Sequence, residues 1–115
     1  MTTTHGPTDF CGVYDAIRRK VAETADESIL REAARLVDGP RQDAYDHPLD
    51  ALSEVGRVWG ALLGCDDIPA ETVGLMMAGM KLVRESRHPK RDNRVDAAGY
   101  IYCADLSIDE RERRA

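Results

Sequence analysis

The hydrophobic positions of the chain recur three or four residues apart, which is the spacing of one face of a helix. No segment alternates strictly between apolar and polar residues, as a half-buried strand would. The first apolar segment, residues 9–23, places five large side chains on one helical face; these are Phe10, Val13, Tyr14, Ile17 and Val21. The pattern predicts a protein built of helices alone.

Helix start and stop signals divide the rest of the chain. A second helix is expected to end at Gly39, which can take the left-handed cap position, because Pro40 cannot continue a helix. Whether this helix is separate from the first, the pattern leaves open. The polar connector 38–48 is long for a helix–helix loop, and such loops often carry function. Pro48 suits the first turn of a third helix, which is expected to end near Gly64.

The fourth predicted helix, residues 70–85, is apolar around nearly its whole circumference. Its large apolar side chains are Val73, Leu75, Met76, Met77, Met80, Leu82 and Val83. A helix of this kind lies at the centre of a bundle or is enclosed at an interface. Its small residues, Gly74, Ala78 and Gly79, would let another backbone approach closely.

A last helix is expected over residues 94–105, and the charged tail 106–115 is expected to fray. These elements predict one all-α domain over residues 1–115, with its core in 9–105, folded as a four- to five-helix bundle. A length of 115 residues fits one domain. A chain of this length has few other helices with which to bury a helix that is apolar on all sides. This favours completion of the bundle by dimerisation.

Charge and cysteine content narrow the function classes. The chain has 16 Lys and Arg against 21 Asp and Glu, a net charge of -5, which argues against direct nucleic-acid binding. Its three cysteines, Cys11, Cys65 and Cys103, are odd in number and lack C-x-x-C spacing, so neither a disulfide framework nor a zinc site is expected. The N-terminus has no signal-peptide pattern, and no apolar run is long enough to span a bilayer. A cytosolic protein is expected.

Two cations interrupt the apolar helix. Lys81 and Arg84 lie three residues apart, and a buried charge is costly unless it is paired. They therefore require carboxylates, a bound anion or access to water. The plainer alternative is that Arg84 reaches water at the helix end while Lys81 forms an ordinary ion pair.

Carboxylates occur in two pairs at helical spacing. Asp92 and Asp96 lie four residues apart, as do Asp50 and Glu54, so each pair shares one helix face. Carboxylates from facing helices are how helical bundles hold Mg²⁺. Each pair also has a structural alternative: Asp92 as an N-cap, Asp96 as the partner of Lys81, and the other two on a solvated face.

The connector adds Arg41, Tyr45 and His47. His47 and His88 are each followed by proline, and neither has a recognised zinc spacing, so surface or hydrogen-bonding roles are favoured. The chain has no phosphate-binding P-loop, no dinucleotide fingerprint and no serine-hydrolase elbow.

Three segments together suggest a family. Residues 38–50 resemble the R-x-x-x-Y-G-x-P opening of small uncharacterised proteins of actinobacterial phages, although Asp46 stands where glycine is usual. Residues 73–84 resemble the central helix of those proteins, and 90–100 their closing R-D-x-x-x-D-x-A-G-Y motif. The resemblance covers about residues 28–104. These proteins are more distantly similar to the nucleotide modification associated domain and to the MazG-like all-α NTP pyrophosphohydrolases, whose E-x-x-E and E-x-x-D pairs this chain lacks.

The resemblance implies a helical bundle, often dimeric, with a Mg²⁺-dependent nucleotide site. A metal-activated water would attack an inner phosphate and release pyrophosphate. The implied metal ligands are Asp50, Glu54, Asp92 and Asp96; the implied catalytic residues are Asp96 and Lys81; and the implied substrate-binding residues are Arg41, Tyr45, His47, Lys81, Arg84 and Tyr100.

Three other functions remain open at this point. The chain could be a degenerate relative that binds nucleotides or other small phosphate ligands without hydrolysis. It could be an interaction protein that sequesters a signalling nucleotide or binds a host factor. It could also be a purely structural oligomer. A homodimer is expected, in the host cytoplasm if the chain is phage-encoded, with no membrane partner.

Overall fold

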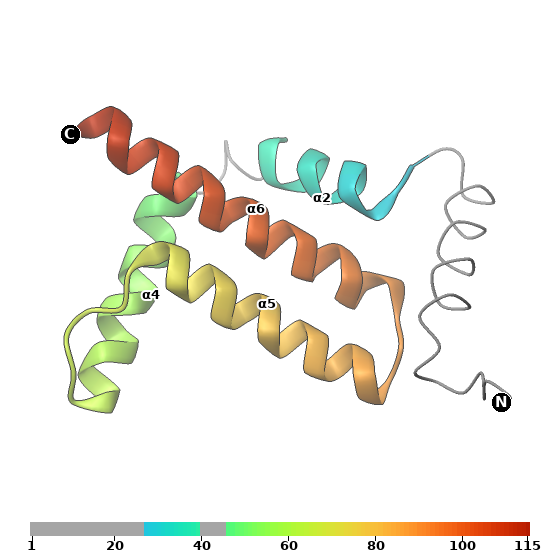
Figure 1. Cartoon of the computed structure of the whole chain (residues 1–115), viewed down its shortest axis with the longest axis horizontal. Coiled ribbons are helices and arrows are strands. Elements are labelled where there is room, and N and C mark those ends of the chain that lie inside the picture. The colour runs from blue at the N-terminus through green and yellow to red at the C-terminus, as the bar shows by residue number, and fades with distance from the viewer. Residues whose placement is uncertain (1–26, 40–45) are drawn as a thin grey trace, which may run out of the picture.

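The computed structural model describes residues 27–39 and 46–115, in which all regular structure is helical (Figure 1). The helices are α2 (Ile29–Asp38), α4 (Pro48–Leu63), α5 (Ala70–Arg87) and α6 (Arg91–Arg114). The all-α prediction is therefore confirmed for these residues. The helix predicted over 9–23 lies outside them. In the described ranges, no helix combines the length and apolar content needed to cross a membrane.

Most of the predicted helix boundaries are confirmed. Pro48 occupies the first turn of α4, and Gly64 ends that helix in the left-handed conformation with φ 70°. The hydroxyl of Ser28 caps α2 by accepting the Arg31 backbone N–H at 3.2 Å. The expected left-handed cap at Gly39 is wrong: its φ is -85°. The next residue in the sequence is proline, which drives the preceding residue toward extended backbone.

The central helix of the described fold is α6, so the structure does not place α5 at the centre, which was one of the two positions that its apolar pattern left open. Figure 1 shows α2, α6 and α5 side by side, with α6 in the middle and α4 across one end. Helix α6 contacts each of the other three. Its buried residues are small, among them Ala97, Gly99, Ala104 and Ser107, so neighbouring helices can approach it from several sides.

Helix α5 is buried on one face only. Val73 is fully buried and Ala78 is 3% exposed. Gly74 lies so close to α6 that a Cβ there would meet the Tyr100 carbonyl oxygen at 2.9 Å. The opposite face carries Leu75, Met76, Leu82 and Val83, which are 44–57% exposed. Periodicity cannot reveal whether a second apolar face is covered, and here the described residues do not cover it.

The charged tail forms the last turns of α6 and does not end the helix at 105 as predicted. Glu110 pairs with Arg114 within the helix, at 2.8 Å. Arg111 reaches back to Glu71 on α5 at 2.6 Å, and Arg114 to Asp50 on α4 at 2.8 Å. Ion pairs within the helix and to two neighbouring helices explain why a polar sequence continues helically.

Candidate functional site

A cleft of about 400 Å³ opens between α2, α4 and α6, with one side chain contributed by α5. Its walls are mainly apolar, with Val37, Leu52 and Val95 coming from three different helices. Among the described residues, its polar groups belong to Asp46, Lys81, Asp96 and Tyr100. This size falls within the range of small-molecule sites, and few polar groups among apolar walls are typical of them.

The Lys81–Asp96 ion pair forms the charged part of the cleft. Lys81 Nζ lies 2.9 Å from Asp96 Oδ2, and the side chains are 16% and 39% exposed. Packing of the bundle holds both residues in place. Lys81 lies one helical turn after buried Ala78 on α5, and Asp96 lies between buried Val95 and Ala97 on α6. The alternative prediction, an ion pair between these residues, is confirmed.

Tyr100 lies one helical turn after Asp96 and lines the same cleft. Gly99, between them, also lines it, and a Cβ there would be only 3.7 Å from Val37 Cγ2. The absent side chain therefore leaves room between α6 and α2. The last helix thus supplies a carboxylate and a phenol together at the wall of the cleft.

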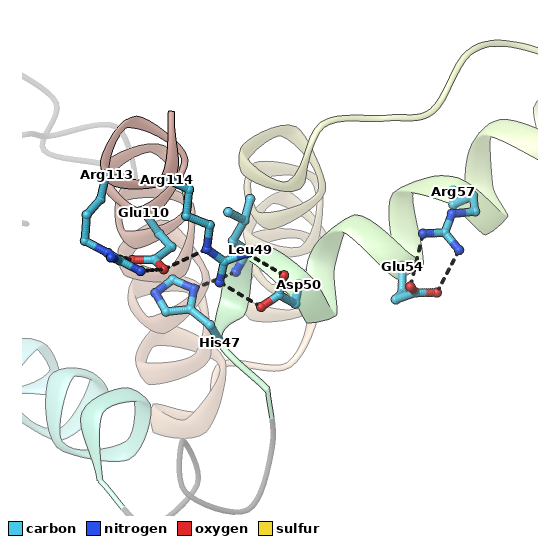
Figure 2. A network of polar contacts seen from close by, with 8 residues as sticks. All are labelled: His47, Leu49, Asp50, Glu54, Arg57, Glu110, Arg113 and Arg114. Atoms are coloured by element: carbon cyan, nitrogen blue, oxygen red, sulfur yellow. Dashed lines mark hydrogen bonds and ion pairs between the residues drawn. The ribbon is translucent and has the colours of Figure 1, made fainter.

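Asp50 and Glu54 do not point at the cleft or at each other. Asp50 accepts two hydrogen bonds from the Arg114 guanidinium, at 2.8 and 3.0 Å. These hydrogen bonds, and then the charge of Arg114, hold the pKa of Asp50 below its usual value. Glu54 is 67% exposed and pairs with Arg57 along α4 at 3.1 Å. Figure 2 shows the two carboxylates turned toward different arginines.

Asp92 is exposed in the first turn of α6. The N-cap position belongs to Lys90, so the expected capping role of Asp92 is also absent. Within residues 27–39 and 46–115, no group of three or more His, Cys, Asp or Glu side chains is placed to share a metal ion. Of the four implied metal ligands, Asp96 is the one that lines the cleft.

The implied phosphate-binding residues are also separated. Arg84 is exposed on α5 and does not line the cleft, in agreement with the prediction that it reaches water. His47 caps α4: its Nδ1 accepts the Leu49 backbone N–H at 2.9 Å, which confirms a hydrogen-bonding role. Arg41 and Tyr45 lie outside the described residues.

Sequence reasoning missed Asp46 as a cleft residue. It had stood out only because the resembling family usually has glycine there, yet it lines the cleft where the connector enters α4. The apolar walls were missed as well. They come from three helices, and no spacing along the chain indicates which faces will meet.

The assembled groups can recognise a ligand that has both an apolar part and an anionic part. The Lys81 ammonium carries three N–H donors, and its ion pair with the Asp96 carboxylate does not use all of them. It can therefore hold a phosphate oxygen as well. The apolar walls can receive a planar or compact group, and Tyr100 can donate or accept a hydrogen bond.

Comparison with known proteins places the chain among phage-related proteins. The gene 55 protein of Mycobacterium phage D29 is 32% identical over 85 residues, which is 73% of this chain and 56% of that relative. The chain thus spans little more than half of the relative's length. No solved structure matches. The family described as "Domain of unknown function (DUF6378)" matches residues 28–107, which include all four described helices up to residue 107. The chain therefore belongs to the DUF6378 family.

Proposed function

We propose that this chain binds a nucleotide, or another small phosphate ligand, in the α2–α4–α6 cleft, as a non-hydrolysing protein of phage nucleotide metabolism. The observation that carries the proposal is Lys81, whose side chain is only 16% exposed and lines a cleft of about 400 Å³. A cation placed in this way is suited to a single phosphate group.

The charges lining the cleft favour a nucleotide that brings its own metal. Among the described lining residues, Asp46 and Asp96 give two negative charges against the one positive charge of Lys81. Mg²⁺ is commonly bound by one or two carboxylates together with substrate phosphates. A Mg²⁺–nucleotide would present its metal to carboxylate and its phosphate oxygens to Lys81, whereas a bare phosphate would meet net repulsion.

Binding without hydrolysis is favoured over turnover. The MazG-like enzymes carry E-x-x-E and E-x-x-D carboxylate pairs, and neither pair occurs in the part of this chain that the structure describes. Among the described residues, Asp50, Glu54 and Asp92 lie away from the cleft, and Asp96 is held by Lys81. A MazG-like pyrophosphohydrolase, in fold and activity, is accordingly the second candidate. It rests on the distant similarity to MazG-like enzymes of the phage proteins that residues 73–84 and 90–100 resemble.

Calorimetric titration with each dNTP, with and without Mg²⁺, tests the proposal. We expect Lys81→Met to weaken nucleotide binding about 10- to 100-fold, because one charge-assisted hydrogen bond is lost. Lys90→Met is the matched control: it removes an exposed lysine at the start of α6 and should bind as the parent does. Equal binding by parent and Lys81→Met would contradict the proposed site.

Pyrophosphate release measured in the same samples separates the candidates. We expect none with any dNTP. Release that is abolished by Asp96→Asn would establish the pyrophosphohydrolase instead. If no nucleotide binds and a host protein co-purifies, the chain is an interaction protein, and the nucleotide proposal fails.

A further inference from the structure

The outward face of α5 is an exposed apolar stripe. Four large side chains are about half exposed, with fractions of 55% at Leu75, 44% at Met76, 56% at Leu82 and 57% at Val83. They recur at helical spacing, with Gly79 between the two pairs. These five residues are called the α5 stripe below. Figure 1 shows α5 at the edge of the α2–α6–α5 layer, so its neighbours in that layer lie on one side.

The stripe is symmetric about Gly79. Leu75 and Val83 lie four residues to either side of this glycine, and Met76 and Leu82 lie three residues to either side. An antiparallel copy of the helix, related by a two-fold axis at Gly79, would place apolar positions against apolar positions along the whole stripe. A two-fold interface requires a surface that is complementary to itself in this way, whereas binding to a different protein does not require a symmetric stripe.

Gly79 has no structural reason within the described chain to be a glycine. A Cβ at this position would meet nothing within 4 Å, and the residue lies inside a regular helix. Glycine in a helix interior costs about 1 kcal/mol relative to alanine. A second backbone crossing at this point would explain the glycine, because closely crossing helices need small residues where they touch.

We propose that the α5 stripe is the interface of a homodimer in which two α5 helices cross antiparallel at Gly79. The stripe supplies the apolar centre, and the exposed residues Thr72, Ser86 and Arg87 supply a polar rim. This proposal does not depend on nucleotide binding, since none of the stripe residues lines the cleft.

Residues 1–26 are the other candidate cover for the stripe, because their sequence carries an apolar helical face. The described chain begins at Glu27, whose carbonyl oxygen accepts a hydrogen bond from Arg91 at 2.9 Å. This point lies at the start of α2, which packs on α6 and does not contact α5. The connection therefore begins on the flank away from α5, and the two-fold symmetry of the stripe favours a second copy.

Sedimentation equilibrium of the full chain tests the dimer. We expect a dimer whose Kd rises by more than about 100-fold in Leu82→Glu, because the two-fold axis buries the added charge twice. Leu30→Glu is the control: Leu30 is 68% exposed on α2, the opposite flank of α6. Far-UV circular dichroism should show unchanged helix content in both variants.

Cysteine cross-linking tests the crossing point, in a background with Cys11, Cys65 and Cys103 replaced by serine. Gly79→Cys should form a disulfide-linked dimer on mild oxidation. Leu75→Cys and Val83→Cys should each cross-link poorly alone and efficiently when mixed, because each faces the other across the axis. A monomeric parent chain, dissociation by Leu30→Glu but not by Leu82→Glu, or cross-linking of Leu75→Cys with itself would each overturn the proposal.

Discussion

The Lys81–Asp96 pair is asymmetric, and this asymmetry predicts unequal effects of removing either partner. Lys81 is 16% exposed and Asp96 is 39% exposed, with 2.9 Å between the charged atoms. Asp96→Asn leaves the lysine ammonium with little water and without its ion-pair partner. Lys81→Met leaves a carboxylate that retains more water, and the methionine fills most of the lysine's volume. We therefore expect the asparagine variant to be the less stable one.

The burial of the pair sets the expected magnitudes. Exposed ion pairs contribute about 0.2–1 kcal/mol, whereas removing one partner of a fully buried pair costs about 3–5 kcal/mol. The pair lies between these limits, and solvent screening at Asp96 brings it toward the lower one. We expect a loss in the free energy of unfolding of about 2 kcal/mol for Asp96→Asn and about 1 kcal/mol for Lys81→Met. In a domain of this size, these losses lower the Tm by roughly 8 and 4 °C.

Urea denaturation of both single variants and the double variant measures these terms. The double variant should be more stable than the sum of the single losses predicts, with a coupling energy of about 1 kcal/mol. Glu54→Gln is the control, because Glu54 is 67% exposed in its pair with Arg57, and its loss should stay within about 0.5 kcal/mol. Equal losses in the two single variants, or a coupling energy indistinguishable from zero, would refute the reasoning.

Two further predictions concern the helices around the site. Gly74→Ala should lower the Tm, since its Cβ would lie 2.9 Å from a backbone carbonyl oxygen of α6. Gly79→Ala has open space around its Cβ, so it should raise the Tm of the dilute monomer and weaken the dimer. The reverse order of the two Tm values in a thermal melt would contradict this packing. Hydrogen bonds from Arg113 and then Arg114 lower the pKa of Glu110 to about 2, below its value in the unfolded chain. The contribution of Glu110 to stability is therefore complete at neutral pH, and it is lost as the pH falls from about 4.3 toward 2. Carbon-13 NMR should show the last turn of α6 losing helical shifts in that window, and a Glu110 titration midpoint near 4.3 would contradict the assignment.

Local helix signals were readable from the sequence, whereas the arrangement of the helices was not. Pro48 and Gly64 bound α4 as predicted because the chemistry of helix ends depends on residues close in the chain. The position of α6 at the centre was not predicted, because it depends on which apolar faces of different helices pack together. Gly74 of α5 approaches α6 closely because it has no side chain and lies against Ala104 and the Tyr100 carbonyl group.

The candidate site was predicted only in part, because the sequence shows which residues share a helix but not which helices pack together. A lysine on an apolar helix requires a partner, and the sequence offered Asp96 as that partner, which the structure confirms. The spacing of Asp50 and Glu54 indicated that they share a helix, but not which residues would form ion pairs with them. Asp50 forms an ion pair with Arg114, a residue of the tail that was expected to fray, and the two residues are 64 positions apart in the chain.

The central claim is that the cleft beside Lys81 receives a nucleotide. The measurement that tests it most directly is a titration of the methyl-labelled chain with a Mg²⁺–dNTP, followed by NMR. Val37, Leu52 and Val95 line the cleft, while Leu62, 78% exposed on α4, is an internal reference. We predict saturable shifts of the three cleft methyl groups, absent in Lys81→Met, with Leu62 unmoved. Cleft methyl signals that stay unchanged at millimolar nucleotide would contradict the account.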